Sequence, residues 1–361
     1  MMKISIKPQW QFTRRDVTQT FPQLLDLLAA IHAEGSINAA AAVLGISYRH
    51  AWGLVRKADR EFGAPLLDMT QGRRARLSAL GEKLLAADRR IEARIAPLLD
   101  SLASELEAEI ERLRAGAAPV LRIHASHGYA IELLLRFLAR RSQTVELKYR
   151  GSMEATASLA AGGCDLAGFH VPLGELQDAS LAFYAPWLDP QRHRVINLAT
   201  RRLGIMVTSR NPKAILSLAD LAQPGVRFVN RQFGSVTRMV LDLLLEREGI
   251  ERARIAGYDT GELTHSGVAS CIASGLADAG FGVEQGARSF GLEFIPVMSE
   301  RYFLLCEEES LATLAVTRIR EVLASKQYRA EAGKLAGIDV TGAGSTLALA
   351  EAFPATAACT P

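Results

Sequence analysis

A run of alanines that leads into a single glycine and then into a basic, aromatic segment is the feature that most restricts how this chain can fold. The stretch GSINAAAAVLGISYRHAWGLVRK, from Gly35 to Lys57, has small side chains before Gly45, and two aromatic and four basic side chains after it. Small side chains let two helices pack closely, and glycine adopts the left-handed backbone of a tight turn without steric cost. We therefore expect two closely crossing helices, the second with an exposed basic end.

The residues before Gly35 complete a small helical bundle. In PQLLDLLAAIHAEG, apolar side chains at helical spacing predict an amphipathic helix that ends at Gly35. Its inward residues are Leu24, Leu27, Leu28 and Ile31. Ser36 and Ser47 are expected to cap the second and third helices. Two helices joined by a three-residue turn form a helix-turn-helix, whose second helix enters the major groove of DNA.

A basic hairpin is predicted directly after the third helix. Within LLDMTQGRRARLS, residues 66–69 and 74–77 can pair about a turn at Gln71 and Gly72. The arginines then project from a wing, which suits contact with phosphates and with the minor groove. The residues expected to contact DNA come from the helix starts, the third helix and this wing: Ser36, Ser47, Tyr48, Arg49, His50, Arg56, Lys57, Arg73, Arg74 and Arg76.

One long helix is predicted over residues 78–114, with Ser78 as its N-cap. Its apolar edge needs a partner and consists of Leu84, Ile91, Ile95, Leu98, Leu102, Leu106 and Leu113. Pro97 is expected to kink or break this helix, because proline lacks an N–H and crowds the carbonyl of Ala93. The segment RAGAAP, residues 114–119, is typical of a linker.

From Val120 onward, short apolar strands alternate with helices, as in an α/β domain. Small polar residues follow the strands in VLRIHASHGYAIELLLRFL, VELKYRGSMEATASLAAG, VRFVNRQFGSVTRMVLDLLL and YDTGELTHSGVASCIASG. Helix N-termini expose unpaired N–H groups and the positive end of the helix dipole. Several that converge on one cleft form an anion site.

Each of these polar residues also has a structural interpretation. Serine and threonine at a helix start are ordinary caps, and a buried histidine can be a satisfied donor. Cys164 and Asp165 are expected to pack at the start of a strand. Arg231 follows a strand that reads as buried, where its charge needs either a carboxylate or the anion of a ligand.

Composition excludes several other classes of protein. The net charge of +3 is too small to identify a polyanion partner by itself. The four cysteines lie far apart without a CxxC pair, so we expect neither a metal site nor a disulfide framework. The first residues contain no apolar core of secretory length, and no run of eighteen apolar residues follows, which favours a cytoplasmic protein.

The stretch GSINAAAAVLGISYRHAW resembles the winged helix-turn-helix of LysR-type regulators and, more closely, that of the molybdate-responsive ModE type. The resemblance covers residues 21 to about 110. It implies a dimer formed through the long helix, with two recognition helices in successive major grooves of a near-palindromic site. The ModE type usually continues with small β-rich ligand modules of the oligonucleotide-binding type, and the present sequence predicts no such pair.

Residues 120–361 are instead similar to the type 2 periplasmic-binding-protein fold of LysR effector domains and of molybdate- and tungstate-binding proteins. The segments NRQFGSVTR, GYDTGELTHSGVASCIASGLADAGFG and LEFIPVMSERYFLL carry this resemblance. It implies two lobes that hold a small anion, with chain crossings near residues 205–207 and 295–297. The residue pattern and the resemblance together give the expected ligand contacts: Ser126, His127, Ser152, Arg231, Ser235, Thr264, His265 and Tyr302.

The sequence therefore predicts an α+β multidomain chain. We expect a winged helix-turn-helix in residues 1–77, a dimerisation helix and linker in residues 78–119, and a two-lobed effector domain in residues 120–361. Lobe I would hold residues 120–204 and 298–361, and lobe II residues 205–297. The expected function is a DNA-binding transcription regulator, dimeric or tetrameric, that senses molybdate, tungstate or a small acid such as formate, without cofactor, metal or membrane partner.

Three other functions remain open at this point. Ser126 beside His127 could suggest a nucleophile and its base, but adjacent residues rarely face each other, and the sequence has no GxSxG elbow and no P-loop. Catalytic residues are therefore not expected. The chain could also be an anion-binding protein without DNA activity, or a constitutive DNA-binding protein with a vestigial α/β domain.

Overall fold

Three short helices form the centre of the N-terminal unit: α1 (Leu24–Glu34), α2 (Ile37–Val43) and α3 (Tyr48–Phe62). The predicted inward residues of α1 are all buried, and the helix ends at Gly35 with φ 66°. Ala40, Ala41 and Ala51 are buried where the helices pack.

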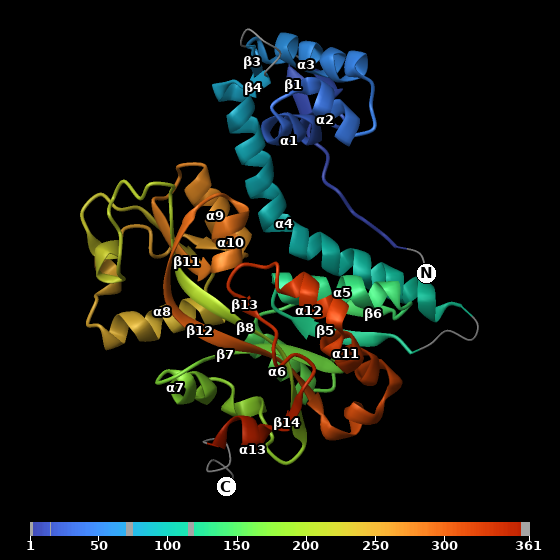
Figure 1. Cartoon of the computed structure of the whole chain (residues 1–361), viewed down its shortest axis with the longest axis vertical. Helices are drawn as coiled ribbons and strands as arrows, with labels where there is room; N and C mark the ends of the chain where they lie inside the picture. Colours follow the sequence, from blue (N-terminus) through green and yellow to red (C-terminus); the bar gives the residue numbers. More distant parts are fainter. Residues whose placement is uncertain (1–2, 15, 70–74, 115–118, 355–361) are drawn as a thin grey trace. The chain divides into compact units, whose positions relative to one another are not determined.

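Figure 1 shows the computed structural model of the chain, which describes residues 3–14, 16–69, 75–114 and 119–354.

Two antiparallel hairpins accompany these helices. Strands β3 (Leu67–Met69) and β4 (Ala75–Leu77) pair as the predicted wing, with Leu67 opposite Leu77. The wing tip, including Arg73 and Arg74, lies outside the described residues. The sequence did not predict the other hairpin, formed by β1 (Gln11–Arg14) and β2 (Val17–Thr20). In this hairpin the ring of Phe12 lies 4.9 Å from that of Phe62.

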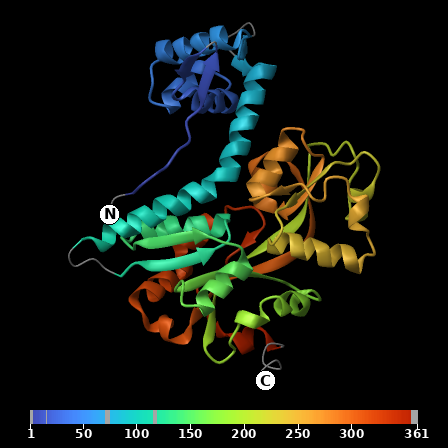
Figure 2. The same ribbon diagram turned by 180° about the vertical axis from the view of Figure 1, so that it is seen from behind.

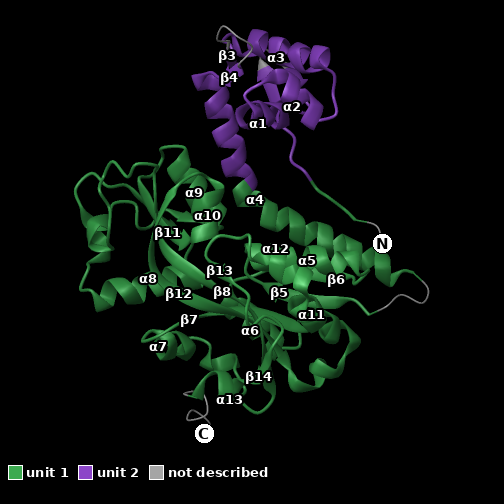
Figure 3. Ribbon diagram, in the orientation of Figure 1, with its two compact units in different colours: residues 1–6, 93–361 green, residues 7–92 purple. Residues whose placement is uncertain are grey.

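The long helix α4 extends from Ala79 to Arg112 and contains Pro97. Ser78 caps it as predicted, because its hydroxyl accepts the N–H of Gly81 at 3.2 Å. The proline does not break the helix, since its missing N–H removes one hydrogen bond while the neighbouring turns keep theirs. The chain divides within α4 into two compact units, residues 7–92 and residues 1–6 with 93–361, which Figure 3 colours separately.

A single ten-stranded sheet organises the larger unit, in the order β10-β9-β11-β8-β12-β7-β5-β6 with β13 and β14 beside β8. We call lobe I the part built on β5 (Leu121–Ala125), β6 (Val145–Tyr149) and β7 (Leu166–Pro172). Lobe II is built on β9 (Phe228–Arg231), β10 (Gly261–Glu262) and β11 (Ala279–Val283). The strands β8 (His193–Val207) and β12 (Glu293–Glu307) extend through both lobes, as Figure 1 shows.

Helices cover the strands of each lobe. Those of lobe I are α5 (Tyr129–Arg140), α6 (Ser152–Ala160), α7 (Gln177–Ala182), α11 (Leu314–Ala324), α12 (Lys326–Ala332) and α13 (Leu349–Ala352). Those of lobe II are α8 (Val236–Arg247), α9 (His265–Ala273) and α10 (Glu284–Ser289). The short strands β13 (Ile338–Asp339) and β14 (Thr346–Ala348) pair with β8. The predicted two-lobed α/β architecture is therefore confirmed.

The two long strands approach closely where the chain passes between the lobes. Gly204 of β8 lies opposite Pro296 of β12, and a Cβ atom on Gly204 would lie 2.1 Å from the carbonyl oxygen of Ile295. Only glycine fits such an approach. The predicted crossings at residues 205–207 and 295–297 fall inside these two strands. None of the described helices combines the length and the apolar character that a membrane span requires.

Candidate functional site

A cavity of about 370 Å³ lies between lobe I and lobe II. Its walls come from the end of β6 and the loops after β5 and β6, from β7 and β8, from the β9–α8 and β10–α9 connections in lobe II, and from residues 94–105 of α4. Cavities that bind small molecules commonly have volumes of about 300 to 1,000 Å³. The size and the position between two lobes are therefore those of a ligand site.

Two buried arginines give this cavity its positive character. Arg201 donates through Nε to Oε1 of Glu300 at 2.6 Å, and the two residues lie opposite each other on β8 and β12. Arg231 instead donates to backbone carbonyls, from Nε to Glu262 at 3.2 Å and from Nη2 to Leu263 at 2.7 Å. Burial, followed by repulsion from Arg201, lowers the pKa of Arg231 to about 9. The guanidinium therefore still carries its charge at neutral pH.

Three histidines line the same cavity in their neutral form. Burial, reinforced by Arg231, lowers the pKa of His127 to about 4. Burial and then Arg201 place the pKa of His170 well below its ordinary value, and burial and then Arg231 do the same for His265. Each imidazole can therefore donate one hydrogen bond and accept another. The cavity combines fixed positive charge with neutral hydrogen-bonding rings.

His170 lines the cavity and has a buried ring nitrogen without a hydrogen-bond partner among the described residues. The side chain is 1% exposed, its Nδ1 lies 3.1 Å from the hydroxyl of Ser152, and its ring stacks on Tyr302 with centroids 3.8 Å apart. Its Nε2 has no hydrogen-bond partner among the residues that the structure describes. Buried polar atoms normally have a partner, so this nitrogen is a candidate donor or acceptor for a polar ligand.

The structure brings five of the sequence-predicted ligand residues together on the cavity wall: Ser126, His127, Arg231, Ser235 and His265. Ser152 and Tyr302 lie directly behind this wall. The Ser152 hydroxyl is 3.3 Å from that of Ser126, and Tyr302 donates to the backbone carbonyl of Ser126 at 3.2 Å. These two residues are placed to orient the residues of the wall.

The hydroxyls of Thr264 and Ser235 form hydrogen bonds with other groups of the protein. The Thr264 hydroxyl accepts the N–H of Gly267 at 2.8 Å and donates to the carbonyl of Ala93 at 2.9 Å. The Ser235 hydroxyl accepts the N–H of Arg238 at 3.2 Å while the residue also lines the cavity. Both serve as helix caps, which is the structural interpretation of serine and threonine at a helix start.

Sequence reasoning missed four important residues of this region. Arg201 and Glu300 form the ion pair between the long strands, His170 lies inside β7, for which only packing is expected, and Arg94 comes from α4. Arg201 could have been identified from the sequence, because an arginine inside an apolar strand needs a partner for its charge, as Arg231 does. Nothing in the local sequence of α4 pointed to a ligand cavity.

The start of α3 forms an exposed polar face in the N-terminal unit. The Ser47 hydroxyl accepts the N–H of His50 at 3.1 Å, which caps the helix, while Tyr48, Arg49 and His50 are exposed. The apolar side of α3 is buried through Ala51, Val55 and Ala58. This division leaves the N-terminal residues of α3 free to contact base edges.

The other described residues expected to contact DNA lie on α3, at the start of α2 and on the wing. Arg56, Lys57 and Arg76 are exposed, and the ammonium of Lys57 lies 5.2 Å from the ring centre of Phe21. Ser36 occupies the N-cap position of α2, but its side chain makes no capping hydrogen bond, contrary to the prediction. Its backbone is extended, as at Ser47, so the difference lies in the side chain, whose hydroxyl accepts no N–H of the first turn.

Two family models match the chain. Residues 22–82 match the model described as bacterial regulatory helix-turn-helix protein, lysR family, and residues 135–324 match the PBP superfamily domain. The second match alone covers more than half of the chain.

Individual proteins are also similar. The uncharacterized protein YvgK of Bacillus subtilis (strain 168) is 27% identical over 246 residues, which are 68% of this chain and 79% of that protein. The molybdenum-pterin-binding protein MopB of Rhodobacter capsulatus is 37% identical over 111 residues, 30% of this chain and 40% of MopB. Among solved structures, CbnR, a LysR family transcriptional regulator, has a TM-score of 0.40 at 20% identity, covering 84% of this chain and 99% of CbnR.

Proposed function

Since the chain belongs to the PBP superfamily and residues 22–82 match the helix-turn-helix of the lysR family, we propose that it is a LysR-type transcriptional regulator whose PBP superfamily domain senses a small anion which alters operator binding. A regulator of this type is not an enzyme. The remaining question is which effector it binds and which residues hold it.

The observation that supports an anion is the pairing of Arg231 with backbone carbonyls in a buried cavity. A guanidinium charge buried in this way is stabilised when an anion binds beside it. His170 supplies a second, independent indication. When its Nδ1 accepts from the Ser152 hydroxyl, its Nε2 carries the proton and can donate to the same anion.

The effectors that we propose are molybdate, tungstate or a small acid such as formate. Each presents negatively charged oxygens, which guanidinium, hydroxyl and imidazole donors can bind. The similarity to a protein named for molybdenum-pterin binding favours the first two, although the matched segment covers only 40% of that protein. Within the cavity, the proposed contacts are Ser126, His127, Arg231, Ser235 and His265. Ser152, Thr264 and Tyr302 support them from behind.

A thermal-shift screen of the full chain against molybdate, tungstate, sulfate and formate tests this proposal. An anion that binds the folded state at a hundred times its Kd stabilises it by about 2.7 kcal/mol, which raises Tm by about 5 °C or more. Arg231→Gln and Ser126→Ala should each reduce that increase. Arg227→Gln is the matched control, because Arg227 forms a surface ion pair with Asp278 at 2.8 Å in the same lobe. The proposal fails if no anion raises Tm in the wild type.

DNA contact is proposed for the exposed residues of the N-terminal unit. The start of α3, with Ser47, Tyr48, Arg49 and His50, would contact base edges. The set proposed to contact phosphates consists of Ser36, Arg56, Lys57, Arg73, Arg74 and Arg76. We place the protein in the cytoplasm, where operator DNA lies.

A homo-oligomer, dimeric or tetrameric, is proposed through α4. Its exposed leucines are Leu98 and Leu102, which also line the cavity, and Leu106. Together with Leu113, directly after the end of α4, they form an apolar edge that suits a second copy of the same helix. Effector binding in the larger unit would then act on a helix shared between subunits.

A further inference from the structure

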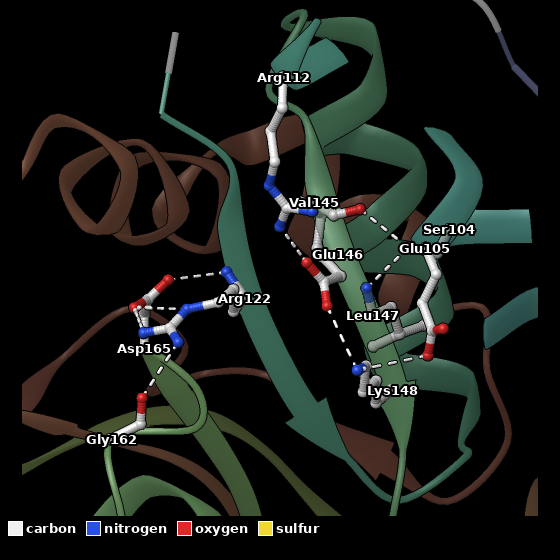
Figure 4. Close-up of polar contacts among 10 residues, drawn as sticks. All are labelled: Ser104, Glu105, Arg112, Arg122, Val145, Glu146, Leu147, Lys148, Gly162 and Asp165. Atoms are coloured by element: carbon white, nitrogen blue, oxygen red, sulfur yellow. Dashed lines mark hydrogen bonds and ion pairs between the residues drawn. The ribbon is translucent and has the colours of Figure 1, made fainter. Parts of the chain in front are cut away.

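The second half of α4 is attached to lobe I along the free edge of its sheet. Strand β6 is the last strand of the sheet in the described part of the chain, so the outward N–H and C=O groups of residues 145, 147 and 149 have no neighbouring strand there. The hydroxyl of Ser104 donates to the carbonyl of Val145 at 2.9 Å and accepts the N–H of Leu147 at 2.6 Å (Figure 4). Ser101 accepts the N–H of Tyr149 at 3.0 Å. Two serines one helical turn apart thus replace the missing strand.

Ion pairs strengthen this first attachment. Lys148 of β6 lies 3.4 Å from Glu105 of α4, and Arg112 of α4 pairs with Glu146, as Figure 4 shows. Figure 2 shows the same relation from behind, with the second half of α4 lying alongside the edge of lobe I. Residues 93–112 of α4 belong to the same compact unit as the two lobes.

A second attachment joins α4 to lobe II. The guanidinium of Arg94 contacts both carboxylate oxygens of Glu262, with Nε to Oε2 at 2.8 Å, and the Glu262 side chain is 1% exposed. The backbone carbonyl of the same Glu262 accepts from Arg231. The ion pair on α4 is therefore only one residue away from the charged group proposed to bind the effector.

Pro97 makes a further bond to lobe II available. In a regular helix, the carbonyl of Ala93 would accept the N–H of residue 97, but proline has no N–H. The Thr264 hydroxyl of lobe II donates to this carbonyl instead, at 2.9 Å. Ala93 and Ser101 are about 12 Å apart along the helix, given a rise of about 1.5 Å per residue. Pro97 lies between the two attachments.

We propose that α4 is the third wall of the effector site and a strap between its lobes. It contributes Arg94, Pro97, Ser101 and Glu105 to the cavity wall and is bonded to lobe II at residues 93–94 and to lobe I at residues 101–104. A change in the angle between the lobes must therefore bend or shift α4 at the turn where Pro97 has removed a hydrogen bond. The same helix continues to Ala79 in the unit that carries the helix-turn-helix. Effector sensing through this strap rests on the function proposed above.

A double-mutant cycle tests the strap in the full chain without any ligand. Thr264→Val removes the donor to Ala93, and Pro97→Ala restores the N–H that a regular helix would use. Thr264→Val should lower Tm by about 2 °C more in the wild-type background than in the Pro97→Ala background. Thr264→Val also removes the N-cap of α9, but it does so in both backgrounds, so this contribution to the Tm change cancels in the comparison. Equal Tm losses in the two backgrounds would overturn the strap.

Hydrogen exchange then tests whether an anion acts through the strap. Sodium molybdate and sodium formate are the probes, each compared with sodium chloride. In the wild type, the probe that binds should change the exchange rate of residues 93–105 by about tenfold. Ser104→Ala, which leaves the cavity wall intact, should still bind the probe but lose most of this change. Arg141→Gln is the control, because Arg141 forms an exposed ion pair with Glu321 within lobe I, 3.3 Å apart.

These outcomes separate the two proposals. Binding of a probe with no change in α4 exchange, or an unchanged response in Ser104→Ala, contradicts transmission through the strap while the anion site stands. Failure of both probes to bind, together with a non-additive Tm cycle, refutes molybdate and formate as effectors while the strap stands.

Discussion

At the scale of single residues, the neutral histidines make the larger unit sensitive to acid. In the unfolded chain an imidazole has a pKa of about 6.5, whereas burial and Arg201 hold the pKa of His170 well below its ordinary value. The unfolded state therefore binds more protons as pH falls through this range, and stability decreases. Glu132 acts in the opposite direction, because burial raises its pKa to about 7 and its protonated form favours the folded state at low pH.

His170→Asn isolates this effect. Leaving His170 neutral at pH 5 costs the folded state about 2 kcal/mol relative to pH 7, and asparagine has no such cost. The fall in Tm between pH 7 and pH 5 should therefore be about 4 °C smaller in the variant than in the wild type. Thermal melts at the two pH values measure it, and parallel pH profiles would show that His170 is not the titrating group.

Single side chains of α3 and of the wing should differ in what they contribute to DNA binding. Arg49→Ala should weaken binding to an operator selected from random DNA by about 1 to 3 kcal/mol, with a much smaller effect on unrelated DNA. Arg76→Ala should weaken binding to the operator and to unrelated DNA about equally. It should also make the slope of log affinity against log salt concentration shallower by about one unit, as expected for the loss of one phosphate contact. Anisotropy titrations at several salt concentrations distinguish the two, and equal losses on both DNAs for Arg49→Ala would mean that it reads no base.

At the scale of elements, the two predicted N-caps give a matched comparison. Ser47 accepts the N–H of His50, whereas Ser36 makes no capping bond. Ser47→Ala should destabilise α3 by about 1 kcal/mol, and Ser36→Ala should have less effect on α2. Hydrogen exchange of the two helices in the full chain measures the difference. Similar increases in both would show that the Ser36 hydroxyl contributes equally.

Helices and strands with a local pattern could be predicted from the sequence, and contacts between distant segments could not. The leucine spacing of α1, the caps Ser47 and Ser78, and the wing register depend on neighbouring residues. The β1–β2 hairpin has no such pattern and is held by aromatic contacts with residues further along the chain.

In the cavity, too, features with a local sequence pattern could be predicted and contacts between distant segments could not. Arg231 could be singled out because a charge after a buried strand is unusual. The pairing of Arg201 with Glu300 depends on the register of two strands that are 99 residues apart. The position of Arg94 depends on how α4 lies against lobe II. The sequence periodicity of α4 described its apolar edge, but its buried face consists of small and polar residues such as Ala103, Ser104 and Ala108.

At the scale of the whole molecule, the exposed leucines of α4 predict self-association. Leu106 is 42% exposed and does not line the cavity. Leu106→Glu should place a charge in the proposed interface and weaken the oligomer by about tenfold or more. Leu216→Glu is the control, because Leu216 is 71% exposed and belongs to lobe II, outside the proposed interface. Sedimentation velocity across a concentration series measures the oligomeric state of each variant, and a monomeric wild type would exclude this interface.

The serine contacts along β6 also bear on how the ligand-binding half can be handled in isolation. A truncated chain that starts after Arg112 would leave the outer edge of β6 bare, and bare strand edges are where sheets of separate molecules join. A truncated chain that starts at Ala93 would keep the second half of α4, whose serines bond to this edge of β6. Poor solubility of the shorter fragment would then reflect a lost neighbour and would say nothing about its capacity to bind a ligand.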